Sequence, residues 1–263
     1  MRIFLIPDVQ AKAGTPTPHL TAAGKYIVAK KPEVIVCIGD FWDMPSLSTY
    51  EKKGKKYWHG KSVMADIDAG NDAMASLLDP IKRYNKKRKK DKRKQYKPRM
   101  IFCMGNHEYR IDRAIADDPA LEGLLSLDML ATDDWEVVPF LESINIEGVL
   151  FSHYFVNPLS LTKGTLCGTI ENKLQKIGHS FCMGHQQTFQ LGYHYLPSGE
   201  VHVGVVAGAF YSHKEDYLGA QGNNHWRGCV MLNDVREGFF DPMPLSLHYL
   251  VEQWGDNDTP RED

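Results

Sequence analysis

The run Val34-Ile35-Val36-Cys37-Ile38, followed at once by Gly39-Asp40-Phe41-Trp42-Asp43, decides the fold predicted for this chain. Two further apolar runs also end in polar residues: Ile3–Ile6 precedes Asp8, and Met100–Met104 precedes Asn106. Continuous apolar runs of this length, separated by stretches of helical character, are typical of buried parallel strands in β-α-β units. The first half of the chain therefore predicts a parallel sheet.

Helical patterns lie between and after these runs. We expect helices over Thr21–Lys31, Ser62–Leu78, Ile111–Leu130 and Thr169–Ile177. The second of them can continue into the basic run that follows it.

The second half of the chain has the character of a β-rich region. Its expected strands are Glu136–Pro139, Ile144–Ile146, Val149–His153, Ser180–Met183, Phe189–Tyr195, Val201–Val206 and Gly228–Leu232. The predicted architecture is an α/β fold of two packed sheets flanked by helices, with polar residues collected where strands end. In open α/β sheets, ligands bind at that edge. We expect one domain over residues 1–250, with a basic insertion at about residues 82–99, and a flexible tail over residues 251–263.

The composition is ordinary for a globular protein, with 43% hydrophobic and 24% charged residues among 263. No apolar run reaches the roughly 18 residues of a membrane span, and the N-terminal segment turns acidic too early for a signal peptide. The five cysteines are scattered and lack close CxxC spacing. A reducing, cytoplasmic setting fits this cysteine usage best.

The net charge of −2 conceals a strong asymmetry between one segment and the rest of the chain. Between Lys82 and Arg99 there are twelve basic residues and one acid, Asp91; the remainder has 19 basic and 32 acidic residues. A concentrated positive segment on an otherwise acidic protein bears on the binding of anions.

Polar residues with metal-ligand chemistry follow the expected strands. They are Asp8 and Gln10, Asp40 and Asp43, Asn106, His107 and Glu108, His153, and His185 with Gln187. Carboxylate, amide oxygen and imidazole together suit Mn²⁺, Fe or Zn²⁺ better than Ca²⁺ or a thiolate-bound metal.

The order of these blocks, D-x-Q, GDxxD, GNHE, H and GHxQ, resembles the five-part signature of calcineurin-like metallophosphoesterases. The resemblance spans Asp8 to Gln187, about two thirds of the chain. The GDFWD block lacks the Arg-Gly that follows it in protein Ser/Thr phosphatases. The chain is therefore more similar to the nuclease and phosphodiesterase branches, and to phosphoesterases common in bacteriophage genomes. The resemblance implies a calcineurin-like two-sheet β-sandwich flanked by helices.

The resemblance also implies roles for individual residues. Asp40 would bridge two divalent metal ions, and Asp8 would bind the first of them. Asn106, His153 and His185 would complete the site of the second. His107 would act as general acid or charge stabiliser at the leaving-group oxygen, with Asp43 orienting it. Metals held in this way generate a hydroxide near neutral pH, which would attack phosphorus.

The chain departs from the family at the first metal site. Gln10 and Gln187 stand where the family has histidine, and a neutral amide oxygen is a weaker ligand than imidazole for Zn²⁺ or Fe. Harder ions, Mn²⁺ above all and also Mg²⁺, are then favoured there. Three states remain open: two metals of unequal affinity, one metal, or a degenerate site.

Residues outside these blocks are candidates for substrate contact. His213 and His225 lie in a Gly/Asn-rich stretch with Tyr211 and Trp226. Lys86, Lys87 and Arg88 belong to the basic segment, whose placement between two ligand blocks could bring it to the rim of the site. Such a segment would contact a nucleic acid without reading its sequence. The alternative is a solvated helix face.

The sequence therefore predicts a metal-dependent phosphoesterase that acts on a phosphodiester in a nucleic acid or nucleotide. A phosphomonoesterase acting on a phosphoprotein or small metabolite is the first alternative. The second is a binding module that has kept the fold and lost catalysis. His107 and Asp43 argue against the second, because a scaffold has no need of a general acid.

Overall fold

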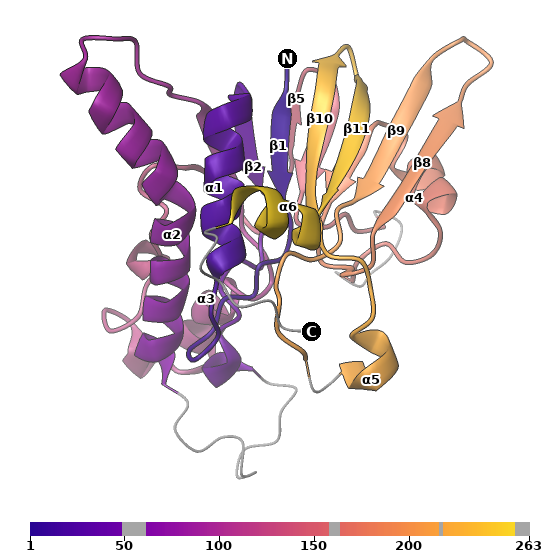
Figure 1. The fold of residues 1–263 in the computed structure, drawn as a ribbon. Coiled ribbons are helices and arrows are strands. Elements are labelled where there is room, and N and C mark those ends of the chain that lie inside the picture. The colour runs from indigo at the N-terminus through magenta and orange to yellow at the C-terminus, as the bar shows by residue number, and fades with distance from the viewer. Residues whose placement is uncertain (49–61, 158–163, 216–217, 256–263) are drawn as a thin grey trace.

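The computed structural model describes residues 1–48, 62–157, 164–215 and 218–255. It contains two mixed sheets flanked by helices (Figure 1), which confirms the predicted α/β architecture. The strands are β1 (Ile3–Ile6), β2 (Val34–Cys37), β3 (Arg99–Cys103), β4 (Glu136–Val138), β5 (Ile144–Ile146), β6 (Val149–Ser152), β7 (Phe181–Met183), β8 (Gln190–Tyr195), β9 (Val201–Val206), β10 (Gly228–Arg236) and β11 (Phe239–Ser246). The helices are α1 (Pro18–Lys30), α2 (Val63–Lys90), α3 (Arg110–Asp117), α4 (Ile170–Ile177), α5 (Gly219–Gly222) and α6 (Leu247–Trp254).

The first sheet has the order β11-β10-β1-β2-β3-β4, and its strands β1 to β4 are parallel, as predicted for the first three. The second sheet has the order β5-β6-β7-β9-β8, with β6, β7 and β9 parallel. Apolar side chains from both sheets pack against each other, among them Leu5, Val36, Phe151 and Val205. The outer face of the first sheet packs against α1, α2 and α6, and α4 covers the second.

Three differences from the predicted elements have local causes. The helix expected over Ile111–Leu130 ends at Asp117, because Asp118 is extended ahead of Pro119 and only short 3₁₀ turns follow. Strand β11 was not predicted, since it contains Pro242 and Pro244; both are tolerated because β11 lies at the sheet edge.

The third difference concerns the expected tail from residue 251. Helix α6 extends to Trp254, whose ring lies 5.7 Å from that of Tyr26 in α1. Residues 256–263 lie outside the described part of the chain. Within the described residues, no helix is both long and apolar enough to cross a membrane.

His19 in α1 is a buried histidine whose two ring nitrogens have no hydrogen-bond partner among the described residues. Burial lowers its pKa from 6.5 to about 4. Because the folded-state pKa lies below the unfolded value, this stability contribution is complete above pH 6.5 and is lost as the pH falls toward 4.

We therefore expect the wild type to lose about 2 kcal/mol more stability than His19→Leu between pH 7.5 and pH 5. Urea unfolding of both proteins at the two pH values measures this difference. Parallel pH dependence in the two proteins would show that His19 is not the buried group that charges.

Candidate metal centre

The carboxyl ends of the parallel strands carry the polar residues expected there. Asp8 follows β1, Asp40 follows β2 and Asn106 follows β3, while His153 follows β6 and His185 follows β7. The second sheet thus supplies the two histidines, and the first supplies the acids and the amide.

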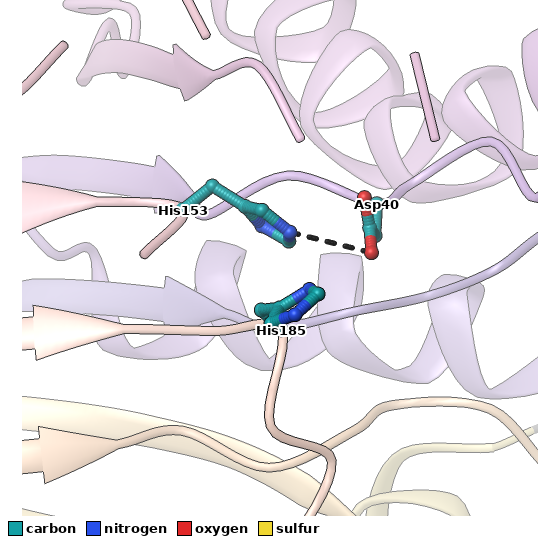
Figure 2. Close-up of side chains that lie close together, drawn as sticks. All are labelled: Asp40, His153 and His185. Atoms are coloured by element: carbon teal, nitrogen blue, oxygen red, sulfur yellow. Dashed lines mark ion pairs between the residues drawn. The ribbon is translucent and has the colours of Figure 1, made fainter. Parts of the chain in front are cut away.

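Asp40, His153 and His185 each offer one ligand atom within 4.8 Å of the others, the only such cluster of three His, Cys, Asp or Glu in the described ranges. Figure 2 shows the two imidazoles pointing at the carboxylate, with His153 Nε2 3.3 Å from Asp40 Oδ2. Asp40 and His153 are buried. The spacing suits one divalent ion held by a carboxylate and two imidazoles.

The hydrogen bonds of His153 fix the direction of its Nε2 atom. Nδ1 lies 2.8 Å from the carbonyl oxygen of Ile38, so it donates there and leaves Nε2 directed at the cluster. Nε2 also lies 2.9 Å from Asn106 Oδ1. Burial by itself would lower the pKa of His153, but the charge of Asp40 and a hydrogen bond to it raise that pKa to about 9. An imidazole nitrogen facing two acceptor oxygens thus favours a proton, and a cation fits the same place.

The loop that carries Asp40 is held by Glu108, which is fully buried. Glu108 Oε1 accepts from the backbone N–H groups of Phe41 and Trp42 at 2.6 and 3.0 Å. Glu108 Oε2 accepts from those of Asp40 and Gly105 at 3.0 and 2.8 Å. The last residue of the GNHE block is therefore an organiser of the backbone at the metal centre.

Replacing Glu108 with Gln should lower the free energy of unfolding by about 3 kcal/mol, because its NH₂ group would face two backbone donors. Urea unfolding in EDTA measures the loss without a contribution from metal binding. Glu142→Gln, at an exposed position, is the control and should change stability by less than about 0.5 kcal/mol. A loss below about 1 kcal/mol for Glu108→Gln would contradict the organising role.

Glycine is required where β3 meets this loop. A Cβ atom on Gly105 would lie 2.2 Å from Asp40 Oδ1 and 2.3 Å from the Asp40 nitrogen. Asp40 itself has a φ of +49°. The sharp turn directs the carboxylate inward, and the missing side chain at 105 leaves room for it.

The residues expected at the first metal site show a different pattern. Asp8 Oδ1 accepts from the backbone N–H of His185 at 3.0 Å, but the buried atoms Asp8 Oδ2 and Gln10 Oε1 have no hydrogen-bond partner among the described residues. Burial, and next the charge of Asp40, raise the pKa of Asp8 to about 7. Two buried oxygens without donors are what a bound cation would satisfy.

Gln187 is placed differently from Asp8 and Gln10. Its Oε1 atom accepts from the hydroxyl of Tyr211 at 2.7 Å. An amide oxygen has a second lone pair, which could still bind a metal ion. Metal binding by Gln187 therefore stays a prediction. Its neighbour His185 has a pKa lowered to about 4, by burial first and then by the charge of His153.

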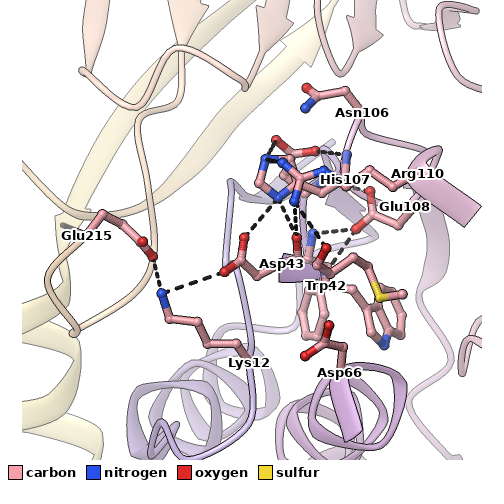
Figure 3. Close-up of polar contacts among 12 residues, drawn as sticks. Lys12, Trp42, Asp43, Asp66, Asn106, His107, Glu108, Arg110 and Glu215 are labelled. Carbon is pink, nitrogen blue, oxygen red and sulfur yellow. Dashed lines mark hydrogen bonds and ion pairs between the residues drawn. The ribbon is translucent and has the colours of Figure 1, made fainter. Parts of the chain in front are cut away.

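His107 and Asp43 form a close pair beside the cluster (Figure 3). His107 Nδ1 lies 3.0 Å from Asp43 Oδ1 and 2.8 Å from the Asp43 carbonyl oxygen, and its backbone N–H donates to Asp40 Oδ1 at 2.9 Å. Burial lowers the pKa of His107, but Asp40 and the bond to Asp43 outweigh this effect, so the net shift is upward.

Sequence reasoning missed Arg110, a buried residue of α3. Its Nη1 atom donates to the carbonyl oxygens of Asp43 and Met44, and its Nη2 atom lies 3.1 Å from His107 Nε2. The spacing of three residues from His107 in a helical stretch was the available signal.

Sequence reasoning also missed a chain of charges that leads away from Asp43 (Figure 3). Lys12 Nζ lies 3.6 Å from Asp43 Oδ2 and 2.6 Å from Glu215 Oε1. Glu215 Oε1 in turn lies 2.6 Å from His213 Nε2. His213 is therefore linked to the His107–Asp43 pair through Lys12 and Glu215. A separation of 203 residues between Lys12 and Glu215 leaves no local signal for this contact.

The contacts of His225 are with Gly222 and Tyr211 rather than with the three clustered residues. Its Nδ1 atom donates to the carbonyl oxygen of Gly222 at 2.8 Å, and its ring lies 5.9 Å from that of Tyr211. Substrate contact by His213 and His225 remains a prediction.

The basic segment does not lie at the rim of the site, as its place in the sequence had suggested, but at the far end of α2. Near the start of helix α2, Gly70 packs against Trp42 in the loop that carries Asp40, and the helix continues without a break to Lys90. At its far end, Tyr84 accepts from Lys31, the residue after α1. With a rise of 1.5 Å per residue, Lys86, Lys87 and Arg88 lie about 25 Å along the helix from Gly70. The segment is thus the end of α2 and its connection to β3.

No protein-family model matches this chain, and no curated protein matches it. Among solved structures, it is similar to Yfce, a phosphoesterase from E. coli, with 10% identity, a TM-score of 0.39, and coverage of 92% of this chain and 98% of that one. It is also similar to a conserved uncharacterized protein, a predicted phosphoesterase, from Streptococcus pneumoniae TIGR4. There the identity is 8%, the TM-score 0.35, and the coverage 94% of this chain and 90% of that one. Scores this low leave the functional argument to the site itself.

Proposed function

We propose that this chain is a metal-dependent phosphoesterase. The observation that carries the proposal is the buried cluster of Asp40, His153 and His185, which lies next to the His107–Asp43 pair. A metal centre beside an imidazole held by a carboxylate combines the two elements that phosphate-ester hydrolysis requires.

The residues present fit one divalent ion well and a second ion less completely. Asp40, Asn106, His153 and His185 would hold the ion of the second site, and Asp8 with Gln10 and Gln187 would contribute to the weaker first site. When bound, such ions polarise phosphoryl oxygens and supply a hydroxide at neutral pH. The amide and carboxylate oxygens at the weaker site favour Mn²⁺.

His107 would manage the proton at the leaving-group oxygen. Its Nδ1–H is held by Asp43, so its Nε2 atom is the one that would face the ester. Asp40 and Asp43 both favour the protonated ring, which is the form that donates. Arg110 contacts the same Nε2 atom and would pass to the phosphate oxygens when the ester binds, because guanidinium pairs with phosphate.

A phosphodiester is the substrate class that we propose, because Met44 and Pro45 stand where protein phosphatases have the Arg-Gly after GDxxD. The setting that we propose is the reducing cytoplasm, which suits five free cysteines.

The direct test of the substrate class compares hydrolysis of bis(p-nitrophenyl) phosphate and p-nitrophenyl phosphate in Mn²⁺ and in EDTA. A higher kcat/KM on the diester, abolished by EDTA and restored by Mn²⁺, is expected. Faster monoester turnover would favour the phosphomonoesterase, and no turnover of either ester in any metal would favour the binding module.

Gln10 and Gln187 provide a separate prediction about the weaker site. Replacing both with His should tighten Mn²⁺ binding there by at least ~10-fold, because imidazole is a stronger donor than an amide. Calorimetric titration of the wild type, both single variants and the double variant measures this, and each single variant should give part of the gain.

Gln186→His is the matched control for that titration. Gln186 donates to the carbonyl oxygen of Leu166 and is not an expected ligand. Unchanged stoichiometry and affinity in the double variant would remove Gln10 and Gln187 from the metal site.

A further inference from the structure

The far end of α2 carries a basic surface that the proposed site does not use. We define it as residues 86–94, of which eight are Lys or Arg and one is Asp91. All but Arg88 are exposed. None of the eight cations forms an ion pair with a carboxylate among the described residues, although Lys82 and Arg83, just before them, do.

The position of this surface separates it from the chemistry. It begins about 25 Å along α2 from Gly70, which packs against Trp42 in the loop that carries Asp40. Asn85 holds it in shape: its side chain donates to the carbonyl oxygen of Tyr96 and accepts from the Tyr96 backbone N–H, so the segment after α2 turns back along the helix. Arg88 donates to the carbonyl oxygen of Lys94 across this turn. The cations of both arms are therefore held together.

We propose that residues 86–94 form a binding surface for the phosphate backbone of a nucleic acid, remote from the metal centre. Duplex DNA carries one charge per ~1.7 Å of its axis, so a dense cluster of cations meets more anionic groups on DNA than on an acidic peptide. An extended acidic peptide offers at most one charge per ~3.3 Å. Outside residues 86–94 the chain has 23 basic and 32 acidic residues, and this negative balance disfavours contact with a polyanion elsewhere on the protein.

The composition of the surface argues against a membrane as the partner. Residues 86–94 include no aromatic or large aliphatic side chain, and an interfacial helix needs such side chains to enter the lipid. Residues 86–94 contain no motif that recognises base edges, so we expect binding to be independent of nucleotide sequence.

The binding proposal does not rest on the phosphoesterase activity, and its test needs none. In EDTA, the anisotropy of a fluorescein-labelled 20-base-pair duplex is measured against protein concentration at several salt concentrations. The variant Lys86→Ser/Lys90→Ser removes two exposed cations from one helix face. It should weaken binding at low salt by at least ~10-fold and reduce the slope of log K against log salt by about 1.8.

Lys176→Ser/Arg236→Ser is the matched control, since it removes two exposed cations from other elements and changes the net charge equally. Its affinity and slope should match the wild type, and thermal unfolding should show all three proteins folded. Absent duplex binding by the wild type, equal losses in both variants, or tighter binding to phosphatidylserine vesicles than to the duplex would each overturn the proposal.

Discussion

Asp40→Asn is expected to lower phosphate-ester hydrolysis by at least ~10⁴-fold, to the level of the metal-free protein. The Asp40 carboxylate faces His153 Nε2 at 3.3 Å and accepts from the His107 backbone N–H at 2.9 Å. An amide can keep the second of these bonds, but it brings a neutral NH₂ group where a cation needs a charged oxygen. The loss therefore falls on metal binding, which elemental analysis and calorimetry measure beside the rate.

Asp66→Asn is the matched control for Asp40→Asn. Asp66 is also buried, and it accepts from the backbone N–H of Ser46 at 2.9 Å, but it belongs to no cluster of possible metal ligands in the described part of the chain. This variant should keep its metal and most of its activity, with a loss in thermal stability only. A hydrolysis rate equal to that of the wild type in a metal-free Asp40→Asn protein would overturn the proposed function.

His107→Ala is expected to leave metal content unchanged and to lower kcat by about 10²–10⁴-fold, the usual contribution of a positioned acid. The loss should depend on the leaving group. A nitrophenolate departs without help, whereas an alkoxide needs a proton, so an alkyl ester should lose more than a nitrophenyl ester. Rates of both ester types in wild type and variant provide the measurement. Equal losses on the two esters would assign His107 to positioning rather than proton transfer.

The candidate metal centre was predictable in part from strand direction. Parallel strands bring their carboxyl ends to one edge, which places Asp40 near Asp8 and Asn106 in the first sheet. His153 follows a strand of the other sheet, and the resemblance to the metallophosphoesterase signature was what placed it beside Asp40. Side chains that complete the centre were not predictable in this way. Arg110 reaches His107 through the conformation of its own side chain, which the sequence does not specify. Lys12 contacts Glu215 only because the loop after β9 returns to the end of β1.

The basic segment illustrates the opposite limit. Its position in the sequence, between Asp43 and Asn106, suggested the rim of the site. A single helix of 28 residues separates the two regions instead, because α2 continues through Pro80. Because the helix is long, residues that are close in the sequence to the site lie far from it in space. No motif in the segment indicates where the helix ends.

The division of the cluster between the two sheets links the metal to the stability of the whole sandwich. Asp40 belongs to the first sheet, and His153 and His185 belong to the second. A bound ion would thus join two layers that share a core of apolar side chains. At an ion concentration 100 times the dissociation constant, a bound ion adds about 2.7 kcal/mol to the free energy of unfolding. Metal supply would then govern how long a molecule survives folded as well as whether it can turn over its ester.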